Sequence, residues 1–127
     1  MSFTTILSVS CGAVLGSLLR WWFGIKLNSF FPTLPLGTLT ANLVGCFLMG
    51  IFIALIRNHT FLPEHVRLAI TTGFLGALTT FSTFSGEAIT LFSDQEYLGF
   101  TLIILGHVGG SLLSTFLGVY VFKFITS

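Results

Sequence analysis

The stretch TTFSTFS, from Thr79 to Ser85, places five hydroxyl residues inside an otherwise hydrophobic segment. Its two phenylalanines, Phe81 and Phe84, are three residues apart and would share one face of a helix. Polar groups are costly inside a membrane, and by default they mark a functional path there. What these groups contact depends on the rest of the chain.

The composition of the chain indicates an integral membrane protein. Of its 127 residues, 54% are hydrophobic and only 7% are charged, and the mean hydropathy is +1.00. A soluble domain carries about 25% charged residues, so a soluble fold is excluded. The net charge of +1, without a basic cluster, excludes a nucleic-acid-binding face.

Four segments are long and apolar enough to cross a bilayer, which takes roughly 20 residues per helix. They cover residues 3–23, 37–56, 66–92 and 98–125. The connections are short, and Pro32, Pro35 and Pro63 within them are typical of helix ends. We therefore predict one all-α transmembrane domain, residues 1–127, with four helices and with its function inside the membrane.

The third segment has features that favour a break near the middle of its helix. Gly76 precedes the hydroxyl cluster, and Ser and Thr hydroxyls compete for backbone hydrogen bonds and bend helices. Non-helical backbone at membrane depth is tolerated only where it is buried or lines a cavity. Carbonyl groups freed by such a break can bind Na⁺. An unbroken helix, with its hydroxyls bonded to the preceding turn, is the alternative.

Small residues recur every four positions on three of the segments. They are Gly12 and Gly16; Gly37, Ala41 and Gly45; and Gly106, Gly110, Ser114 and Gly118. Such stripes let helices approach closely in lipid, so they predict a compact bundle without indicating a function.

The basic residues give little preference for one orientation in the membrane. Arg57, Arg67 and Lys123 lie on one side, and Arg20 and Lys26 on the other. A bias this small permits insertion both ways up, and oppositely inserted copies can form an antiparallel dimer. A single orientation with a weak charge signal is the alternative. Four short helices fill their own centre, so we expect any ion path at a helix interface or between subunits.

Polar residues on the second and fourth segments also lie at helical spacing. Thr38 and Asn42 are four residues apart, and His107, Ser111 and Thr115 repeat every four residues. Hydroxyl and amide groups donate hydrogen bonds, which suits them to replace the water around a small anion.

The rest of the interior supports an anion rather than a multivalent cation. Glu87 is the only carboxylate expected there, whereas a multivalent cation prefers several. The edges of aromatic rings are positive, so Phe81 and Phe84 can rest their edges against an anion.

Four stretches of the sequence, in this order, resemble the Fluc (CrcB) fluoride channels of bacteria. They are GSLLRWW (16–22), GTLTANLVGCFLMG (37–50), TTGFLGALTTFSTFSGE (71–87) and GHVGGSLLSTFLG (106–118). The resemblance implies a channel, not an enzyme, that exports cytoplasmic fluoride passively across the bacterial cytoplasmic (inner) membrane. It also implies an antiparallel, dual-topology homodimer with two pores.

The resemblance further implies roles for individual residues. The fluoride pore would be lined by Phe81, Phe84, Asn42, Ser82, Thr83, Ser111, Thr115, Thr38 and His107. Arg20 and Glu87 would lie in the aqueous vestibule. A structural Na⁺ at the dimer centre would be bound by the backbone carbonyls of Gly76 and Thr79.

A small multidrug-resistance-type, proton-coupled cation exporter is the alternative function, since it also has four spans and can insert both ways. Such exporters use a carboxylate in the first span, which this sequence lacks, so that reading requires Glu87. An intramembrane enzyme in which His107 activates Ser82 or Ser85 has no supporting nucleophile motif. A purely structural assembly subunit is the last alternative.

Overall fold

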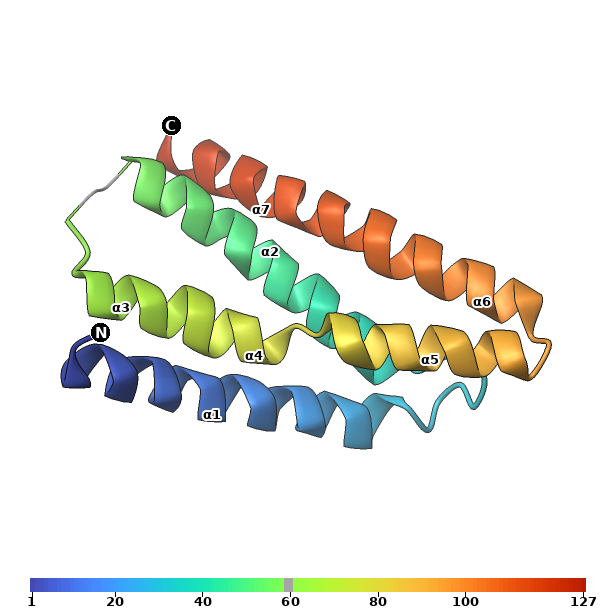
Figure 1. The fold of residues 1–127 in the computed structure, drawn as a ribbon. Coiled ribbons are helices and arrows are strands. Elements are labelled where there is room, and N and C mark those ends of the chain that lie inside the picture. Colours follow the sequence, from blue (N-terminus) through green and yellow to red (C-terminus); the bar gives the residue numbers. More distant parts are fainter. Residues whose placement is uncertain (59–60) are drawn as a thin grey trace.

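Four helical spans build the computed structural model, which describes residues 1–58 and 61–127 (Figure 1). The helices that are long and apolar enough to cross a membrane are Phe3–Leu27, Leu36–Asn58, Glu64–Ser93 and Tyr97–Thr126. The prediction of an all-helical protein with four membrane spans is therefore confirmed. The two termini lie at the same end of the bundle, as an even number of spans requires.

The first two spans are continuous helices, α1 (Phe3–Leu27) and α2 (Leu36–Asn58). The Ser2 hydroxyl begins α1 by accepting a hydrogen bond from the Thr5 N–H at 3.1 Å. The first turn of α2 is held from outside, because the Asn28 side-chain oxygen accepts from the Gly37 N–H at 2.8 Å. Side chains of the first connection thus satisfy N–H groups that the helix itself leaves unpaired.

The third span consists of four pieces: α3 (Glu64–Leu68), the π-helix η1 (Ala69–Leu75), α4 (Gly76–Leu78) and α5 (Phe81–Ser93). Between α4 and α5 the backbone leaves helical geometry. Thr79 has φ −86° and ψ 152°, and Thr80 has φ −151° and ψ 121°, both extended. In Figure 1 this segment joins α4 to α5 near the middle of the bundle.

The fourth span comprises α6 (Tyr97–Ile104), the π-helix η2 (Leu105–Gly109) and α7 (Gly110–Thr126). A tight turn connects it to α5, with Gln95 in the left-handed region at φ 62°. The sequence analysis did not anticipate either π-helix, because one extra residue in a turn leaves no periodicity to detect. Such turns are rare and frequently lie at functional sites.

Two seams of close helix contact hold the bundle together. One joins α1 to η1 and α4, and the other joins α2 to α7. At Gly16 an added Cβ atom would lie 2.1 Å from the Phe74 carbonyl oxygen, and at Gly118 it would lie 2.1 Å from the Phe47 carbonyl oxygen. Larger residues there would force the helices apart, so these glycines pack as their stripes predict.

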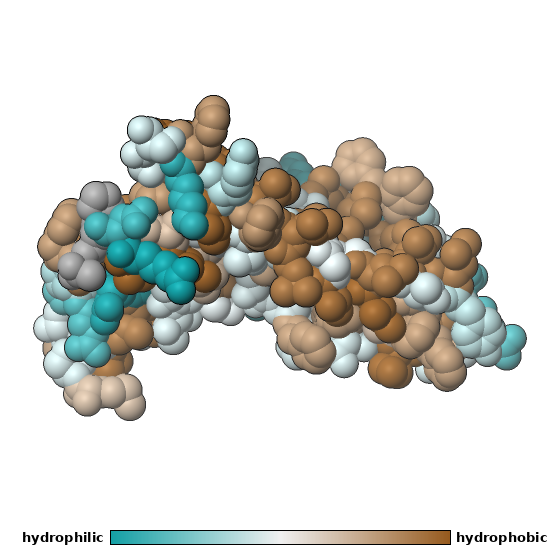
Figure 2. Space-filling view, turned by 90° about the horizontal axis from the view of Figure 1, so that it is seen from above, coloured by the Kyte–Doolittle hydropathy of each residue, from teal (hydrophilic) through white to brown (hydrophobic). Residues whose placement is uncertain are grey.

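The outer surface is largely apolar, as expected of a surface in lipid. Figure 2 shows hydrophobic residues over the middle of the molecule, while hydrophilic ones gather mainly at the end with the second connection. One buried cluster, formed by Phe84, Ala88, Leu91 and Ile103, ties α5 to α6. The two halves of the third span therefore pack on different partners, α4 on α1 and α5 on α6.

Candidate functional site

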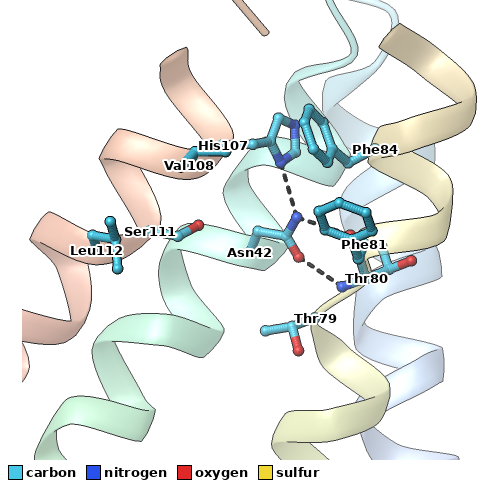
Figure 3. A pocket seen from close by; sticks show the side chains of 9 residues that line it. All are labelled: Asn42, Thr79, Thr80, Phe81, Phe84, His107, Val108, Ser111 and Leu112. Atoms are coloured by element: carbon cyan, nitrogen blue, oxygen red, sulfur yellow. Dashed lines mark hydrogen bonds between the residues drawn. The ribbon is translucent and has the colours of Figure 1, made fainter. Parts of the chain in front are cut away.

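A pocket of about 350 Å³ opens where the third span is not helical (Figure 3). Its walls come from α2, the segment around Thr79 and Thr80, α5, η2 and α7. The lining residues are Asn42, Thr79, Thr80, Phe81, Phe84, His107, Val108, Ser111 and Leu112. The structure thus brings together the amide, the aromatic pair, the histidine and one hydroxyl of the expected pore.

Asn42 is bound to the backbone of Thr80 through both atoms of its side-chain amide. Its Oδ1 atom accepts from the Thr80 N–H at 2.7 Å, and its Nδ2 donates to the Thr80 carbonyl at 3.1 Å. An extended residue directs its N–H and C=O to the same side, which is the geometry that a primary amide matches. Asn42 is only 7% exposed and compensates Thr80 for the helical bonds it lacks.

His107 connects the amide to the aromatic rings. Its Nδ1 atom lies 2.9 Å from Asn42 Nδ2, and its ring stacks on Phe84 at a centroid distance of 4.5 Å and an angle of 24°. Phe84 in turn meets the ring of Phe81 nearly edge to face, at 5.4 Å and 76°. His107 is 3% exposed, and its Nε2 atom is buried with no partner among the described residues.

The two phenylalanines differ sharply in environment. Phe84 belongs to the buried cluster of α5 and α6, whereas Phe81 is 76% exposed on the surface of a single chain. Figure 3 shows both rings beside Asn42, with Phe81 closer to the non-helical segment. The wall of the pocket at Phe84 is therefore fixed by packing, whereas the wall at Phe81 lies on the surface of the chain.

Several hydroxyls of TTFSTFS form the cap of α5. Thr80 Oγ1 accepts from the Thr83 N–H at 3.1 Å and donates to Thr83 Oγ1 at 3.1 Å. Ser82 Oγ lies 3.3 Å from Thr80 Oγ1. Ser82 and Thr83 do not line the pocket, although they lie next to it in sequence. The Thr80 hydroxyl caps α5, a common use of Ser and Thr, and the hydroxyls of Ser82 and Thr83 lie within hydrogen-bond distance of it.

The carbonyls predicted to bind Na⁺ have lost their usual helical partners. In a continuous helix, Gly76 C=O would accept from the Thr80 N–H, which instead donates to Asn42. Thr79 C=O would accept from the Thr83 N–H, which instead donates to Thr80 Oγ1. Free carbonyls are suitable Na⁺ ligands, and a shell built on those of Gly76 and Thr79 would need further ligands from a second copy of the chain.

Arg20 reaches the same region from the first span. Its Nε atom donates to the carbonyl of Ala77 at 3.0 Å. This carbonyl belongs to the last turn of α4, where carbonyls lack intrahelical partners and the helix dipole is negative. The Arg20 guanidinium therefore satisfies a carbonyl that lacks a helical partner, and it also lines a second cavity.

A second cavity, of about 490 Å³, contains the two residues predicted for the vestibule. It is lined in part by Arg20, Glu87, Thr38 and Thr83. The Thr38 hydroxyl donates to Glu87 Oε1 at 2.5 Å, whereas Oε2 of the same carboxyl is buried without a partner in the described part of the chain. Thr38 and Thr83 thus accompany the vestibule pair rather than the pocket around Asn42.

Thr115, like Ser82, is an expected pore residue that lines neither cavity. Its hydroxyl donates to the Ser111 carbonyl at 3.0 Å, one turn back along α7. At Gly50 of α2 an added Cβ would lie 2.0 Å from the Thr115 carbonyl oxygen. The close seam between α2 and α7 thus covers this part of α7, and Ser111 is the last polar residue of α7 that lines the pocket.

Most of these residues were predicted from the sequence, but their connections were not. The pairing of Asn42 with Thr80 and His107 and the bond from Arg20 to Ala77 have no counterpart in the predictions. These partners are far apart in the chain, and no local pattern reports them. A capping signal at Thr80 was present, since a hydroxyl residue precedes an apolar helical run, but it was hidden within the hydroxyl cluster.

Comparison with known proteins gives a consistent result along nearly the whole chain. The family model described as CrcB-like protein, Camphor Resistance (CrcB), matches residues 7–119. A protein of Nitrosospira multiformis named fluoride-specific ion channel FluC is 49% identical over 125 residues, covering 98% of both chains. Proteins of the same name from Acinetobacter baylyi and Haemophilus influenzae are 48% and 41% identical, over 98% and 93% of this chain and 98% and 92% of theirs. This chain is therefore a multi-pass membrane protein that belongs to the CrcB-like family.

Proposed function

We propose that this chain is the subunit of a fluoride-selective ion channel that exports cytoplasmic fluoride passively. One observation carries the proposal: an uncharged pocket of amide, imidazole, hydroxyl and aromatic edges lies at membrane depth, in a chain that matches named fluoride channels end to end. The function is conduction rather than catalysis, as in the family.

The chemistry of the pocket suits a small anion. Fluoride is strongly hydrated, so it enters a narrow passage only where donors replace its water. Neutral donors do this without the tight binding that a fixed positive charge would cause, and weak successive sites allow the ion to leave again. The positive edges of Phe81 and Phe84 add attraction without trapping it.

Passive export is sufficient energetically. In acid surroundings fluoride enters a cell as neutral HF and ionises inside, where the membrane potential acts on the anion. That potential contributes about 2.3 kcal/mol per charge for every 100 mV. A negative interior therefore drives fluoride outward without proton coupling, and we place the protein in the bacterial inner membrane.

The working assembly in this proposal is an antiparallel homodimer with two pores. Two observations support it: the near-balanced charges of the loops and the exposure of Phe81 on a single chain. A second copy would cover this ring and complete the wall of the pocket. The third span would keep its interruption at Thr79 and Thr80 in the dimer.

A Na⁺ ion at the centre of the dimer would hold the two interruptions together. The carbonyls of Gly76 and Thr79 from both copies would supply its ligands, because their helical partners donate elsewhere. The ion would neutralise the negative ends of the two α4 helices, a structural rather than a conducting role.

We assign the remaining polar residues to successive parts of the path. Arg20 and Glu87, with Thr38 and Thr83, form the vestibule. The pocket follows, with Asn42, Phe81, Phe84, His107 and Ser111, and Ser82 and Thr115 contribute at its margins.

The proton-coupled cation exporter gains no support from the relatives, which are named ion channels. Its required acid, Glu87, accepts a hydrogen bond from Thr38 and shares a cavity with Arg20. A cation would meet the guanidinium there.

Release of ions from proteoliposomes tests the proposed function. A fluoride-selective electrode should record rapid fluoride release without a proton gradient, while a chloride electrode records none. Phe81→Ile and Phe84→Ile remove the aromatic edges, and we expect a large loss of fluoride release in at least one. Equal release of both halides by the unmodified protein would contradict fluoride selectivity, and unchanged selective release in both variants would contradict the aromatic role.

A further inference from the structure

We propose that His107 is a positioning residue for the Asn42 amide. The lone pair on its Nδ1 accepts the remaining amide hydrogen, and this bond holds the amide where it clamps the non-helical backbone at Thr80. The inference deepens the proposed channel function, on which its transport test rests, while its spectroscopic test does not depend on transport.

The orientation of the Asn42 amide follows from the backbone of Thr80. The Thr80 nitrogen can only donate, so the amide atom 2.7 Å away must be the oxygen. The Thr80 carbonyl can only accept, so the atom 3.1 Å away must be the nitrogen. No choice between the two amide orientations remains.

That orientation determines the protonation of His107. Asn42 Nδ2 carries two hydrogens; one goes to the Thr80 carbonyl and the other points to His107 Nδ1 at 2.9 Å. Nδ1 must therefore be an acceptor, and the neutral ring carries its proton on Nε2. An imidazolium could not accept this bond and would leave the Asn42 donor unpaired in a buried site.

Burial and stacking on Phe84 hold the His107 ring in place beside Asn42. His107 is 3% exposed, and the face of its ring lies 4.5 Å from Phe84 at an angle of 24°. A half-turn of the ring about Cβ–Cγ would keep this stacking, but it would place the Cδ2 C–H, which cannot accept a hydrogen bond, against the Asn42 amide. Figure 3 shows the ring between the amide and Phe84.

Both hydrogens of the Asn42 amide are thus used within the protein. In this arrangement the Asn42 side chain forms part of the wall of the ion path, and the Nδ1 atom of His107 fixes the orientation of its amide. The Nε2 atom of His107 is buried and has no partner among the described residues. The competing hypothesis is therefore that Nε2 donates a hydrogen bond to the ion.

Two substitutions separate the roles of the ring nitrogens. In His107→Asn the side-chain oxygen lies about as far from the backbone as Nδ1 and can accept from Asn42, but nothing replaces Nε2. In His107→Gln the amide reaches the position of Nε2 and leaves that of Nδ1 empty. Both variants lose the stacking on Phe84 equally, so each is the control for the other.

We expect both variants to release less fluoride than the unmodified protein, because both lose the stacking on Phe84. Release by His107→Asn should exceed that by His107→Gln about tenfold, the change typical of one lost buried hydrogen bond. The reverse order would assign the function to Nε2 and overturn the proposal. Equal loss or equal retention in the two variants would also overturn it.

Nitrogen-15 NMR of the histidines provides the second test. The resonances that remain in the double variant His59→Gln, His65→Gln belong to His107, the third histidine of the sequence. We expect its Nδ1 to show the shift of an unprotonated nitrogen and its Nε2 that of an N–H. A protonated Nδ1 would refute the positioning role even if both variants failed to fold. Absence of fluoride release by the unmodified protein would instead count against the proposed function.

Discussion

The pocket around Asn42 and the cavity around Glu87 differ in how completely their polar groups are paired. Asn42 has three hydrogen bonds inside the protein, to both backbone groups of Thr80 and to His107. Glu87 has one partner, Thr38, and leaves its second oxygen buried without one in the described part of the chain. A saturated network rigidifies its surroundings, whereas a half-satisfied one readily changes partner. The comparison indicates a rigid wall in the first region and an adjustable one in the second.

The largest effect should follow from Asn42→Asp, which keeps the shape of the side chain but removes both donors. The carboxylate cannot donate to the Thr80 carbonyl or to His107, and it faces a carbonyl oxygen instead. Loss of two bonds at roughly 1 kcal/mol each, together with that repulsion, corresponds to about 100-fold. We expect fluoride release to fall by that factor, as measured with a fluoride electrode on proteoliposomes.

Circular dichroism and gel filtration of Asn42→Asp in detergent serve as the control for folding. Native helical content with lost release would locate the defect in the pocket. Full release by Asn42→Asp would break the comparison, since the wall would then not depend on the clamp.

Arg20 links the two regions, so its replacement should have the next largest effect. Arg20→Leu removes the donor to the Ala77 carbonyl and the positive charge of the cavity. Hydrogen bonds to charged groups are worth about 1.5–3 kcal/mol, so release should fall at least about tenfold. Arg20→Lys keeps a donor and a charge without the guanidinium fork and should lose less. Rates for both variants equal to that of the unmodified protein would show that neither the bond nor the charge contributes.

Glu87→Gln should have a smaller effect. The Gln oxygen still accepts from Thr38, and the amide adds a donor where the buried oxygen has no described partner. We expect release to change by about threefold in either direction, consistent with a difference of less than 1 kcal/mol. A proton-coupled exporter would lose all activity in this variant, so complete loss would favour that alternative. The measurement is fluoride release with and without a pH gradient.

The smallest effect should come from Thr38→Val, which removes the hydroxyl but preserves the shape. Release should fall about twofold. Thr38→Val in a Glu87→Leu background should add little, because Glu87→Leu has already removed the bond that the two residues share. Thr101→Val is a matched control, since the Thr101 hydroxyl is exposed and bonds only to Tyr97 of its own helix. Additive losses in the double variant would show that the two side chains act independently.

The four spans were predictable from the sequence because hydropathy and proline placement report them directly. The position of the candidate site was also predictable, because hydroxyls accumulate where the third span is interrupted. The partners were not. Asn42 and Thr80 are 38 residues apart and Asn42 and His107 are 65 apart, and their meeting depends on how closely glycine seams bring the helices together.

The sequence likewise could not predict which of several similar hydroxyl residues line the pocket. Ser82 and Thr83 resemble Ser111 in chemistry, yet their hydroxyls lie beside the Thr80 hydroxyl that caps α5, while Ser111 lines the pocket. Thr115 continues the expected four-residue repeat, but α2 packs closely where the repeat would continue. Spacing on an isolated helix reports a shared face, and only the packed bundle decides what covers that face.

The extended backbone at Thr79 and Thr80 predicts that the protein is sensitive to the thickness of its bilayer. Its two halves are short rigid rods attached to different neighbours, α4 to α1 and α5 to α6, and only Thr79 and Thr80 join them. When lipid chains lengthen or shorten, tilting of one rod against the other concentrates at these two residues and at the amide that clamps them. We expect fluoride release to vary with acyl-chain length, with an optimum at the thickness that leaves this joint undisturbed.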